Sequence, residues 1–301
     1  MPARSFLEIN NSRGLNILET WQIRDILEWS AKYFKKKHID QPRLTSEILL
    51  AHSLKCRRID LYLNYDRPLN QPDRDRYREM LKSRAKGKPW QYIVGETEFY
   101  SLPFRVNDAV LIPRPETEIL IDAVLDHCKK NEPYKIWDIG SGSGAIAISL
   151  AKNLPLAKIL ATDISDQAIK IAKKNAELNH VGERICFRQS DLAKNVEETR
   201  FDLIVSNPPY IATSEFSSLP IEVRHEPVTA LNGGKDGLYF YRRFAKICQI
   251  HLASRGALAV EIGADQGERV REILKRSAIF YSVEILKDYA RRDRVIYAKK
   301  I

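Results

Sequence analysis

Residues 136–144 read Ile-Trp-Asp-Ile-Gly-Ser-Gly-Ser-Gly, an apolar strand that runs directly into a glycine-rich turn, and a helical pattern follows. Glycines at such a turn permit positive φ and let a ligand lie against bare backbone, and the helix N-terminus presents free N–H groups. The next apolar run ends about 20 residues later at Asp163, whose carboxylate can accept hydrogen bonds from ribose hydroxyls. The stretch therefore predicts a site for an adenosine-containing cofactor, either NAD or S-adenosylmethionine. A tight turn with a capping acid is the simpler alternative.

Strand-like and helix-like segments alternate from residue 118 onward. Strands are expected at 135–139, 158–163, 184–189, 201–206, 256–262, 279–286 and 293–299, and helices at 118–130, 144–152, 166–178, 237–253 and 266–275. This alternation implies a parallel sheet with helices on both faces. The connection at 287–292 is too short for a helical crossover, so the last two strands should pair antiparallel. The predicted fold is α/β, a seven-stranded, mostly parallel Rossmann-like sheet with an antiparallel terminal hairpin, which resembles class I methyltransferases.

The first part of the chain has a different pattern. Apolar residues recur at three- and four-residue spacing over residues 18–85, punctuated by Pro42, Pro68 and Pro72, which predicts a small helical bundle. The stretch 92–106 has a hairpin pattern, so that Tyr92 to Tyr100 should form a strand. We therefore expect a helical domain over 1–88, a β-hairpin linker over 89–112 and the α/β domain over 113–301.

Composition restricts the class of protein. Of the 301 residues, 44% are hydrophobic and 29% are charged, which suits a soluble globular protein. No apolar run approaches the roughly 20 residues that a membrane helix needs. Residues 1–8 lack the apolar core of a signal peptide. The four cysteines, at positions 56, 128, 186 and 248, have no metal or redox spacing. We expect a cytoplasmic protein with reduced thiols and neither metal nor membrane association.

The net charge of +10 is unevenly distributed. Residues 1–88 contain 19 Lys and Arg against 11 Asp and Glu, whereas the remainder contains 30 against 28. A basic first part suggests an acidic partner such as nucleic acid. The other interpretation is a solvated helical surface, because basic residues such as 35–37 alternate with acids and few aromatic residues lie among them.

A second motif, Asn207-Pro208-Pro209-Tyr210, follows the strand expected at 201–206. The prolines fix φ, lack N–H groups and push the preceding residues toward extended geometry, so backbone carbonyls there can face a cleft. Asn207 offers both an acceptor and a donor, and Tyr210 offers a face for stacking. Such a stiff platform suits a planar NH₂ group, as in an amide or adenine, although a strand that simply ends in a Pro-Pro turn has the same sequence. A rigid amide clamp beside the glycine loop favours a methyltransferase over a nicotinamide enzyme.

Several stretches together resemble the peptide chain release factor glutamine N5-methyltransferases. They are residues 89–95, 98–100, 111–118, 138–147, 202–211, 226–227, 230–231, 233, 236–238, 261–263 and 293–295. The resemblance covers residues 20–300. The loop at 113–118, Pro-Arg-Pro-Glu-Thr-Glu, separates this branch from the related ribosomal-protein glutamine methyltransferases. The chain departs from the family at Ser141, where Thr is common, and at 290–292, where a Gly is usual.

The resemblance implies that the chain transfers a methyl group from S-adenosyl-L-methionine to the amide N5 of the Gln in the Gly-Gly-Gln motif of release factors, leaving S-adenosyl-L-homocysteine. The helical domain would then recognise the release factor, and we expect a monomer that requires no nucleic acid. Asn207 Oδ1 and the Pro208 carbonyl would accept the two amide N–H bonds, and Tyr210 would pack on the amide plane. Loop residues Arg114, Glu116 and Thr117 would either shape the pocket mouth or pack a hinge.

The resemblance also implies the set of site residues. Catalysis would depend on Asn207, Pro208 and Tyr210, and substrate binding on Asn207, Pro208, Pro209 and Tyr210. Cofactor binding would depend on Gly140, Ser141, Gly142, Ser143, Gly144, Asp163, Leu192 and Asn207. Residues 225–227 would form a structural loop over the cleft.

Other functions use parts of the same pattern. An adenine amino-methyltransferase acting on DNA or RNA could use the clamp on a flipped base, but no separate base-recognition domain is evident. A non-catalytic nucleic-acid-binding protein would not need the glycine loop together with Asn207. An NAD oxidoreductase would bind a dinucleotide and transfer no methyl group.

Overall fold

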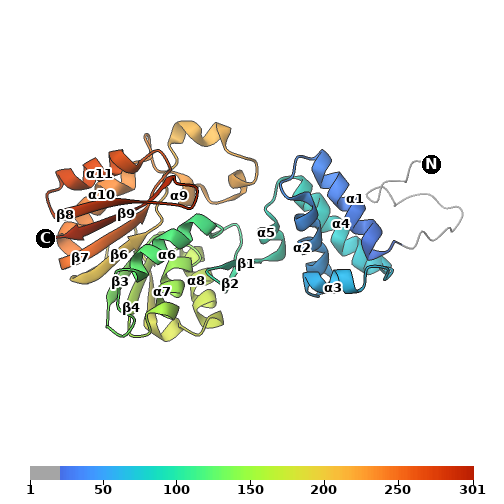
Figure 1. Cartoon of the computed structure of the whole chain (residues 1–301), viewed down its shortest axis with the longest axis horizontal. Helices are drawn as coiled ribbons and strands as arrows, with labels where there is room; N and C mark the ends of the chain where they lie inside the picture. The colour runs from blue at the N-terminus through green and yellow to red at the C-terminus, as the bar shows by residue number, and fades with distance from the viewer. Residues whose placement is uncertain (1–20) are drawn as a thin grey trace, which may run out of the picture. The chain divides into compact units, whose positions relative to one another are not determined.

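The computed structural model describes residues 21–301, which divide into two compact units with the boundary between Val94 and Gly95 (Figure 1). Each unit is described by itself. The expectation about targeting depends on residues 1–8, which lie outside the described residues. Among the described residues, none of the helices combines the length and apolar content that a membrane crossing needs.

The N-terminal unit is helical. It contains α1 (Ile23–Lys36), α2 (Pro42–Leu54), α3 (Arg58–Leu63), α4 (Gln71–Ala85) and α5 (Trp90–Val94). Pro42 occupies the first position of α2, where its missing N–H costs no helical hydrogen bond. The Asn70 side chain caps α4, because its Oδ1 accepts from Asp73 N at 2.8 Å. The apolar faces of the first four helices meet in a core that includes Ile26, Leu50 and Tyr77. The expected helical bundle is confirmed.

The strand expected to start at Tyr92 is wrong over its first three residues. Tyr92–Val94 belong to α5, and Gly95 with φ of +86° separates this helix from the strand that follows. Tyr92 is buried, and Trp90, Ile93 and Val94 pack against the helical core. Contacts with the core therefore outweigh the β propensity of this short Tyr-Ile-Val run.

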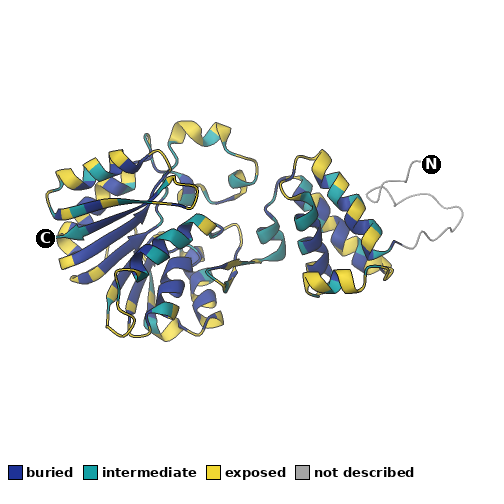
Figure 2. Ribbon diagram, viewed as in Figure 1, coloured by how far each residue is buried: buried dark blue, intermediate teal, exposed yellow. Residues whose placement is uncertain are grey.

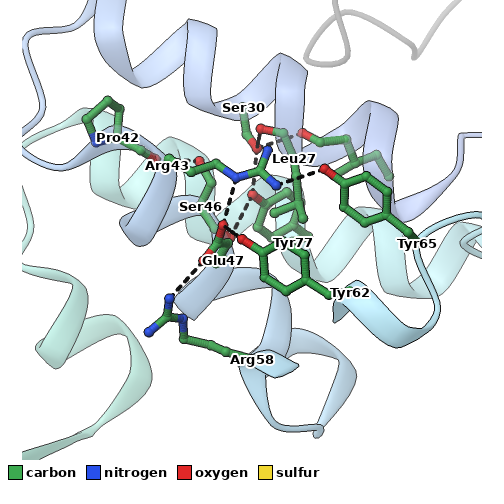
Figure 3. Close-up of polar contacts among 11 residues, drawn as sticks. Leu27, Ser30, Pro42, Arg43, Ser46, Glu47, Arg58, Tyr62, Tyr65 and Tyr77 are labelled. Carbon is green, nitrogen blue, oxygen red and sulfur yellow. Dashed lines mark hydrogen bonds and ion pairs between the residues drawn. The ribbon is translucent and has the colours of Figure 1, made fainter. Parts of the chain in front are cut away.

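A buried carboxylate ties α2 to α3 (Figure 3). The side chain of Glu47 is 3% exposed and accepts from Arg43 Nε at 2.7 Å and from Arg58 Nη2 at 2.9 Å. The Tyr62 hydroxyl also donates to Glu47. Burial alone would raise the pKa of Glu47, but the hydrogen bonds from Tyr62, Arg58 and Arg43 together lower it. This carboxylate is held charged and serves the fold of the helical unit.

The C-terminal unit begins with a hairpin of β1 (Glu96–Phe99) and β2 (Leu102–Arg105) that pair antiparallel. Phe99 and Phe104 are buried in the core of this unit. The Asn175 side chain holds the edge of the hairpin, because its Oδ1 accepts from Arg105 N at 2.7 Å and its Nδ2 donates to Arg105 O at 3.0 Å. The hairpin is thus attached to the α/β unit.

Seven strands form the main sheet in the order β5-β4-β3-β6-β7-β9-β8. Their bounds are β3 Lys135–Ile139, β4 Lys158–Asp163, β5 Ile185–Gln189, β6 Phe201–Ser206, β7 Leu252–Glu261, β8 Phe280–Lys287 and β9 Asp293–Lys300. Strands β3 to β7 pair parallel, and β9 pairs antiparallel with both β7 and β8. The predicted mostly parallel sheet with an antiparallel terminal hairpin is confirmed.

Helices cover both faces of this sheet (Figure 1). Those on one face are α6 (Glu118–Leu125), α7 (Ala145–Asn153) and α8 (Asp166–Leu178), and those on the other are α10 (Tyr239–His251) and α11 (Gly267–Arg276). Short helical turns occupy the connections, namely η1 Pro115–Thr117, η2 Gly182–Arg184, η3 Thr213–Ser218, η4 Val223–His225 and α9 Val228–Leu231. The strands are buried between the two helical layers (Figure 2), as their continuous apolar runs predict.

Three details differ from the sequence expectations. Strand β7 begins at Leu252, four residues before the expected start, because α10 ends at His251 instead of residue 253. Helix α6 ends at Leu125 instead of residue 130, and residues 126–130 are mostly polar and exposed, with Cys128 the member that packs against the core. The turn between β8 and β9 forms without the glycine that is usual in the family, since Arg291 takes the left-handed conformation at φ of +61°. The Asp288 side chain closes this turn by accepting from Arg292 N at 2.9 Å.

Candidate active site

The fold brings the glycine loop and the Asn-Pro-Pro-Tyr motif together. The first follows β3 and the second follows β6, and these strands are parallel neighbours in the sheet. The Ser206 hydroxyl donates to Ile139 O at 2.6 Å and so joins the two carboxyl ends directly. The next strand in the chain, β4, pairs with one edge of β3, while β6 pairs with its other edge, so the strand order reverses at β3. Open α/β sheets bind ligands at such a switch in strand order.

A cavity of about 390 Å³ lies at this place, within the usual range for small-molecule sites. Nine of the predicted site residues line it, namely Gly140, Ser141, Gly142, Ser143, Asp163, Leu192, Asn207, Pro208 and Pro209. Thr117 and Pro227 are also part of its wall. Gly144 and Tyr210 are not among the lining residues.

The glycine loop leaves open space at two positions. Gly140 and Gly142 have φ of +75° and +53°, and a Cβ at either would meet no atom within 4 Å. Gly144 differs, because a Cβ there would lie 3.0 Å from Ile148 Cδ1 and 3.2 Å from Ala172 Cβ. The first two glycines therefore expose backbone to the cavity, and Gly144 permits the close packing of α7 against α8.

Asp163 is attached to the glycine loop. Its Oδ2 accepts from Gly142 N at 2.8 Å, and its Oδ1 accepts from Ser165 N at 2.9 Å. Burial raises the pKa of Asp163, and these backbone hydrogen bonds oppose that rise. Each carboxylate oxygen keeps further lone pairs for a ligand in the cavity.

Asp138 in β3 has a structural task that sequence reasoning did not assign. It is fully buried, and its Oδ2 accepts from Ala147 N, in the first turn of α7, at 3.2 Å. Burial raises the pKa of Asp138 to about 7. The position was visible in the sequence only as an acid inside an apolar strand that leads into a glycine loop.

The side-chain amide of Asn207 is hydrogen-bonded to Thr117, which is in turn hydrogen-bonded to Glu261. Asn207 Nδ2 donates to Thr117 Oγ1 at 3.0 Å, and Thr117 Oγ1 donates to Glu261 Oε2 at 2.6 Å. Thr117 is 4% exposed and Glu261 is 1% exposed. Glu261 ends β7, and burial raises its pKa to about 7. Within residues 21–301, Asn207 Oδ1 accepts no hydrogen bond.

Sequence reasoning gave Thr117 a place at the pocket mouth or in a hinge and gave Glu261 no role. The available signal was positional, because Glu261 also stands at the carboxyl end of a strand next to β6. The contact between Thr117 and Glu261 joins residues 144 positions apart, and so no local pattern predicts it.

The backbone of Tyr210 is tightly fixed. Its carbonyl accepts from Gln266 Nε2 at 2.9 Å, and a Cβ at Gly237 would lie 2.4 Å from the same oxygen. The Tyr210 ring packs against the apolar cluster that contains Tyr241 and Phe244. Burial raises the pKa of Tyr210 to about 12, so its hydroxyl stays protonated at neutral pH. These contacts fix the end of the Asn-Pro-Pro-Tyr segment.

An ion pair joins two segments of the cavity wall. Arg114 Nη2 lies 2.5 Å from Glu226 Oε2, and the neighbouring residues Pro113 and Pro227 line the cavity. Glu226 is 4% exposed, and burial raises its pKa to about 7 although Arg114 opposes the rise. Across residues 21–301 there is no group of three or more His, Cys, Asp or Glu side chains placed to bind a metal ion.

Two protein families match this chain, the PrmC N-terminal domain over residues 25–95 and the methyltransferase small domain over residues 116–224. The release factor glutamine methyltransferase of Fusobacterium nucleatum is 42% identical over 279 residues, which are 92% of this chain and 78% of that protein. The protein of the same name from Geobacter sulfurreducens is 40% identical over 92% of this chain and 96% of its own length. The chain belongs to the release factor glutamine methyltransferase family. It is therefore an S-adenosylmethionine-dependent methyltransferase, as the sequence resemblance predicted.

Other methyltransferases of known structure have the same fold as this chain. The hMettl16 catalytic domain in complex with MAT2A 3′UTR hairpin 6 matches with a TM-score of 0.53 at 18% identity, over 76% of this chain and 82% of that one. A methyltransferase from Pyrococcus furiosus matches with a TM-score of 0.50 at 19% identity, over 67% of this chain and 91% of its own. Family membership excludes the NAD oxidoreductase and the non-catalytic nucleic-acid-binding protein considered from the sequence.

Proposed function

We propose that this chain methylates the side-chain amide nitrogen N5 of the Gln in the Gly-Gly-Gln motif of peptide chain release factors. S-adenosyl-L-methionine is the donor, S-adenosyl-L-homocysteine is the second product, and no metal takes part. The observation that carries the proposal is the placement of Asn207, whose Nδ2 is engaged by Thr117 at 3.0 Å while its Oδ1 stays available beside the cavity.

The chain's own residues fit the donor. Gly140 and Gly142 present backbone with no side chain in the way, which suits the close approach of the methionine part. Asp163 keeps acceptor capacity for ribose hydroxyls, and Leu192 offers an apolar border for adenine in the same cavity. When bound, S-adenosylmethionine supplies a methyl group on a positively charged sulfur, open to attack by an electron pair.

The acceptor nitrogen needs orientation more than deprotonation. An amide nitrogen is a poor nucleophile because its lone pair is delocalised into the carbonyl. Asn207 Oδ1 and the Pro208 carbonyl would accept the two N–H bonds of the substrate amide and so direct the lone pair toward the methyl group. The new N–C bond forms as the S–C bond breaks, the positive charge passes to the nitrogen, and one N–H proton then leaves to water. Packing of the Tyr210 ring on the amide plane remains part of this proposal.

The pair Asn207→Ala and Asn131→Ala tests this function. Asn131 is exposed and lies outside the cavity, so its variant is the matched control. We expect Asn207→Ala to lower methyl transfer to a release factor by about 10²- to 10³-fold, the usual cost of losing one group that stabilises developing charge. Binding of S-adenosylmethionine, measured by calorimetry, should change little.

The assay is transfer of a radiolabelled methyl group to purified release factor. Near-normal activity of Asn207→Ala would remove the role assigned to Asn207. Equal losses in Asn207→Ala and Asn131→Ala would indicate a general defect instead of a lost clamp.

A further inference from the structure

The Asn207 clamp is the outer member of a chain of three polar side chains that runs inward from the cavity. Thr117 is the middle member and Glu261 the inner one, with separations of 3.0 Å and 2.6 Å. They come from three separate parts of the unit, since Asn207 follows β6, Thr117 ends η1 and Glu261 ends β7. Both inner members are at least nine-tenths buried, so water does not compete for these hydrogen bonds.

The single hydroxyl proton of Thr117 determines which way the Asn207 amide can face. An ionised Glu261 accepts only, so the Thr117 proton points to Glu261 and the hydroxyl oxygen offers lone pairs to Asn207. Asn207 must then present its NH₂ group to Thr117, which leaves Oδ1 for the substrate. A protonated Glu261 can donate to Thr117 instead. The Thr117 proton is then free to meet Asn207 Oδ1, and the Asn207 NH₂ group turns toward a substrate amide that also presents NH₂.

We propose that Glu261 is a positioning residue for methyl transfer, which fixes the acceptor orientation of Asn207 through the Thr117 hydroxyl. The inference rests on the proposed function, because the orientation matters only if Asn207 Oδ1 accepts from the substrate. Glu261 touches neither substrate nor donor in this scheme. Its negative charge sets the direction in which the Thr117 O–H bond points.

The surroundings of Glu261 make its charge sensitive to pH. Burial raises its pKa to about 7, the Thr117 hydrogen bond and the Arg294 and Arg114 charges lower it, and the Glu116 charge raises it. The phenols of Tyr210 and Tyr241 also face this region, but burial holds their pKa values far above neutrality. The rate of methyl transfer should therefore fall as the pH falls through the pKa of Glu261, since the protonated form no longer fixes Asn207.

Four variants test the inference: Thr117→Val, Thr117→Ser, Glu261→Gln and the double variant Thr117→Val/Glu261→Gln. Thr117→Val keeps the shape of the side chain and removes the hydroxyl, and we expect kcat to fall about 10- to 100-fold with KM little changed. Thr117→Ser restores the hydroxyl and should recover most of that loss. Glu261→Gln imitates the protonated state, so its kcat should be low and flat where the wild-type rate falls at acidic pH.

The double variant separates positioning from a structural role. If Glu261 acts through Thr117, the double variant should have the same kcat as Thr117→Val, because the Thr117 hydroxyl that links Glu261 to Asn207 is already absent. If the two residues instead made independent structural contacts, their fold-losses in kcat would multiply in the double variant, and each variant would lower the melting temperature. The readouts are kcat and KM for purified release factor between about pH 6 and pH 9, with donor binding as the check on folding.

The outcomes distinguish this inference from the function on which it rests. Wild-type protein that places no methyl group on release factor Gln would overturn the proposed function. Wild-type activity with unchanged kcat in Thr117→Val, or an acidic fall in rate that persists in Glu261→Gln, would overturn the positioning role alone. A large loss in Thr117→Val, recovery in Thr117→Ser and no further loss in the double variant would support it.

Discussion

The helical unit and the α/β unit each bury a glutamate, and the two are treated in opposite ways. Glu47 is 3% exposed and has two arginines and a tyrosine as hydrogen-bond partners, which hold its pKa below the usual value. Glu261 is 1% exposed, and within residues 21–301 its side chain has one hydrogen-bond partner, the Thr117 hydroxyl. Burial raises the pKa of Glu261 to about 7. Glu47 is kept ionised by its positively charged and hydrogen-bonding neighbours, whereas Glu261 has a pKa close to neutral pH.

This difference shows that the chain tolerates incompletely paired buried carboxylates near the cavity. In the α/β unit Asp138, Glu226 and Glu261 all have pKa values raised to about 7 by burial, and all three lie in or next to the segments that form the cavity. Perturbed carboxylates collect at functional sites because such sites need specific charge states more than stability. Glu47, which stabilises a helical bundle, has no such constraint and is fully paired.

The largest expected effect on stability comes from Glu47→Gln. This variant removes a charge that Arg43 and Arg58 share, so both arginines lose their ionic partner, and the free energy of unfolding of the helical unit should fall by roughly 3 kcal/mol. The pKa of Glu47 is lowered by folding, so its contribution is present above the unfolded pKa and is lost as pH falls through the folded value. Hydrogen exchange of the α2 amides should therefore accelerate in the variant at pH 7, and this difference from wild type should shrink as the pH falls below the unfolded pKa.

The same substitution at Glu261 should change the free energy of unfolding less, and in the opposite direction. The pKa of Glu261 is raised by folding, so the neutral form is favoured, and the resulting stability is lost as pH rises through about 7. Glu261→Gln stays neutral and should stabilise the α/β unit by about 1–3 kcal/mol at pH 8, with a difference near zero at about pH 4, below the unfolded pKa. Denaturant unfolding at the two pH values, followed by hydrogen exchange of the β7 amides, measures this. Destabilisation at pH 8 would mean that Glu261 is a structural carboxylate like Glu47.

The sequence predicted the sheet well because its strands are continuous apolar runs that end at glycines, acids or prolines. Strands β3, β4 and β6 have the expected bounds, and the loops after them form the cavity wall. Helix α5 was missed because three residues with β propensity take their conformation from a core that a local pattern does not contain.

The partners of buried carboxylates were not predictable in the same way. Glu47 and Arg58 are 11 residues apart, and Thr117 and Glu261 are 144 apart, so each pairing depends on the completed fold. A sequence shows which residues can ionise, but the folded surroundings decide which of them stay charged. The Asn-Pro-Pro-Tyr motif could be recognised from the sequence, while the hydrogen bonds from Asn207 through Thr117 to Glu261 required the structure.

The most direct test of the account is to locate the methyl group. The wild-type protein is incubated with S-adenosylmethionine and with either purified release factor or duplex DNA, and each product is analysed by mass spectrometry. We predict one added methyl group on the side chain of the Gln in the Gly-Gly-Gln motif and none on DNA. A methyl group on adenine, with none on that Gln, would contradict the account.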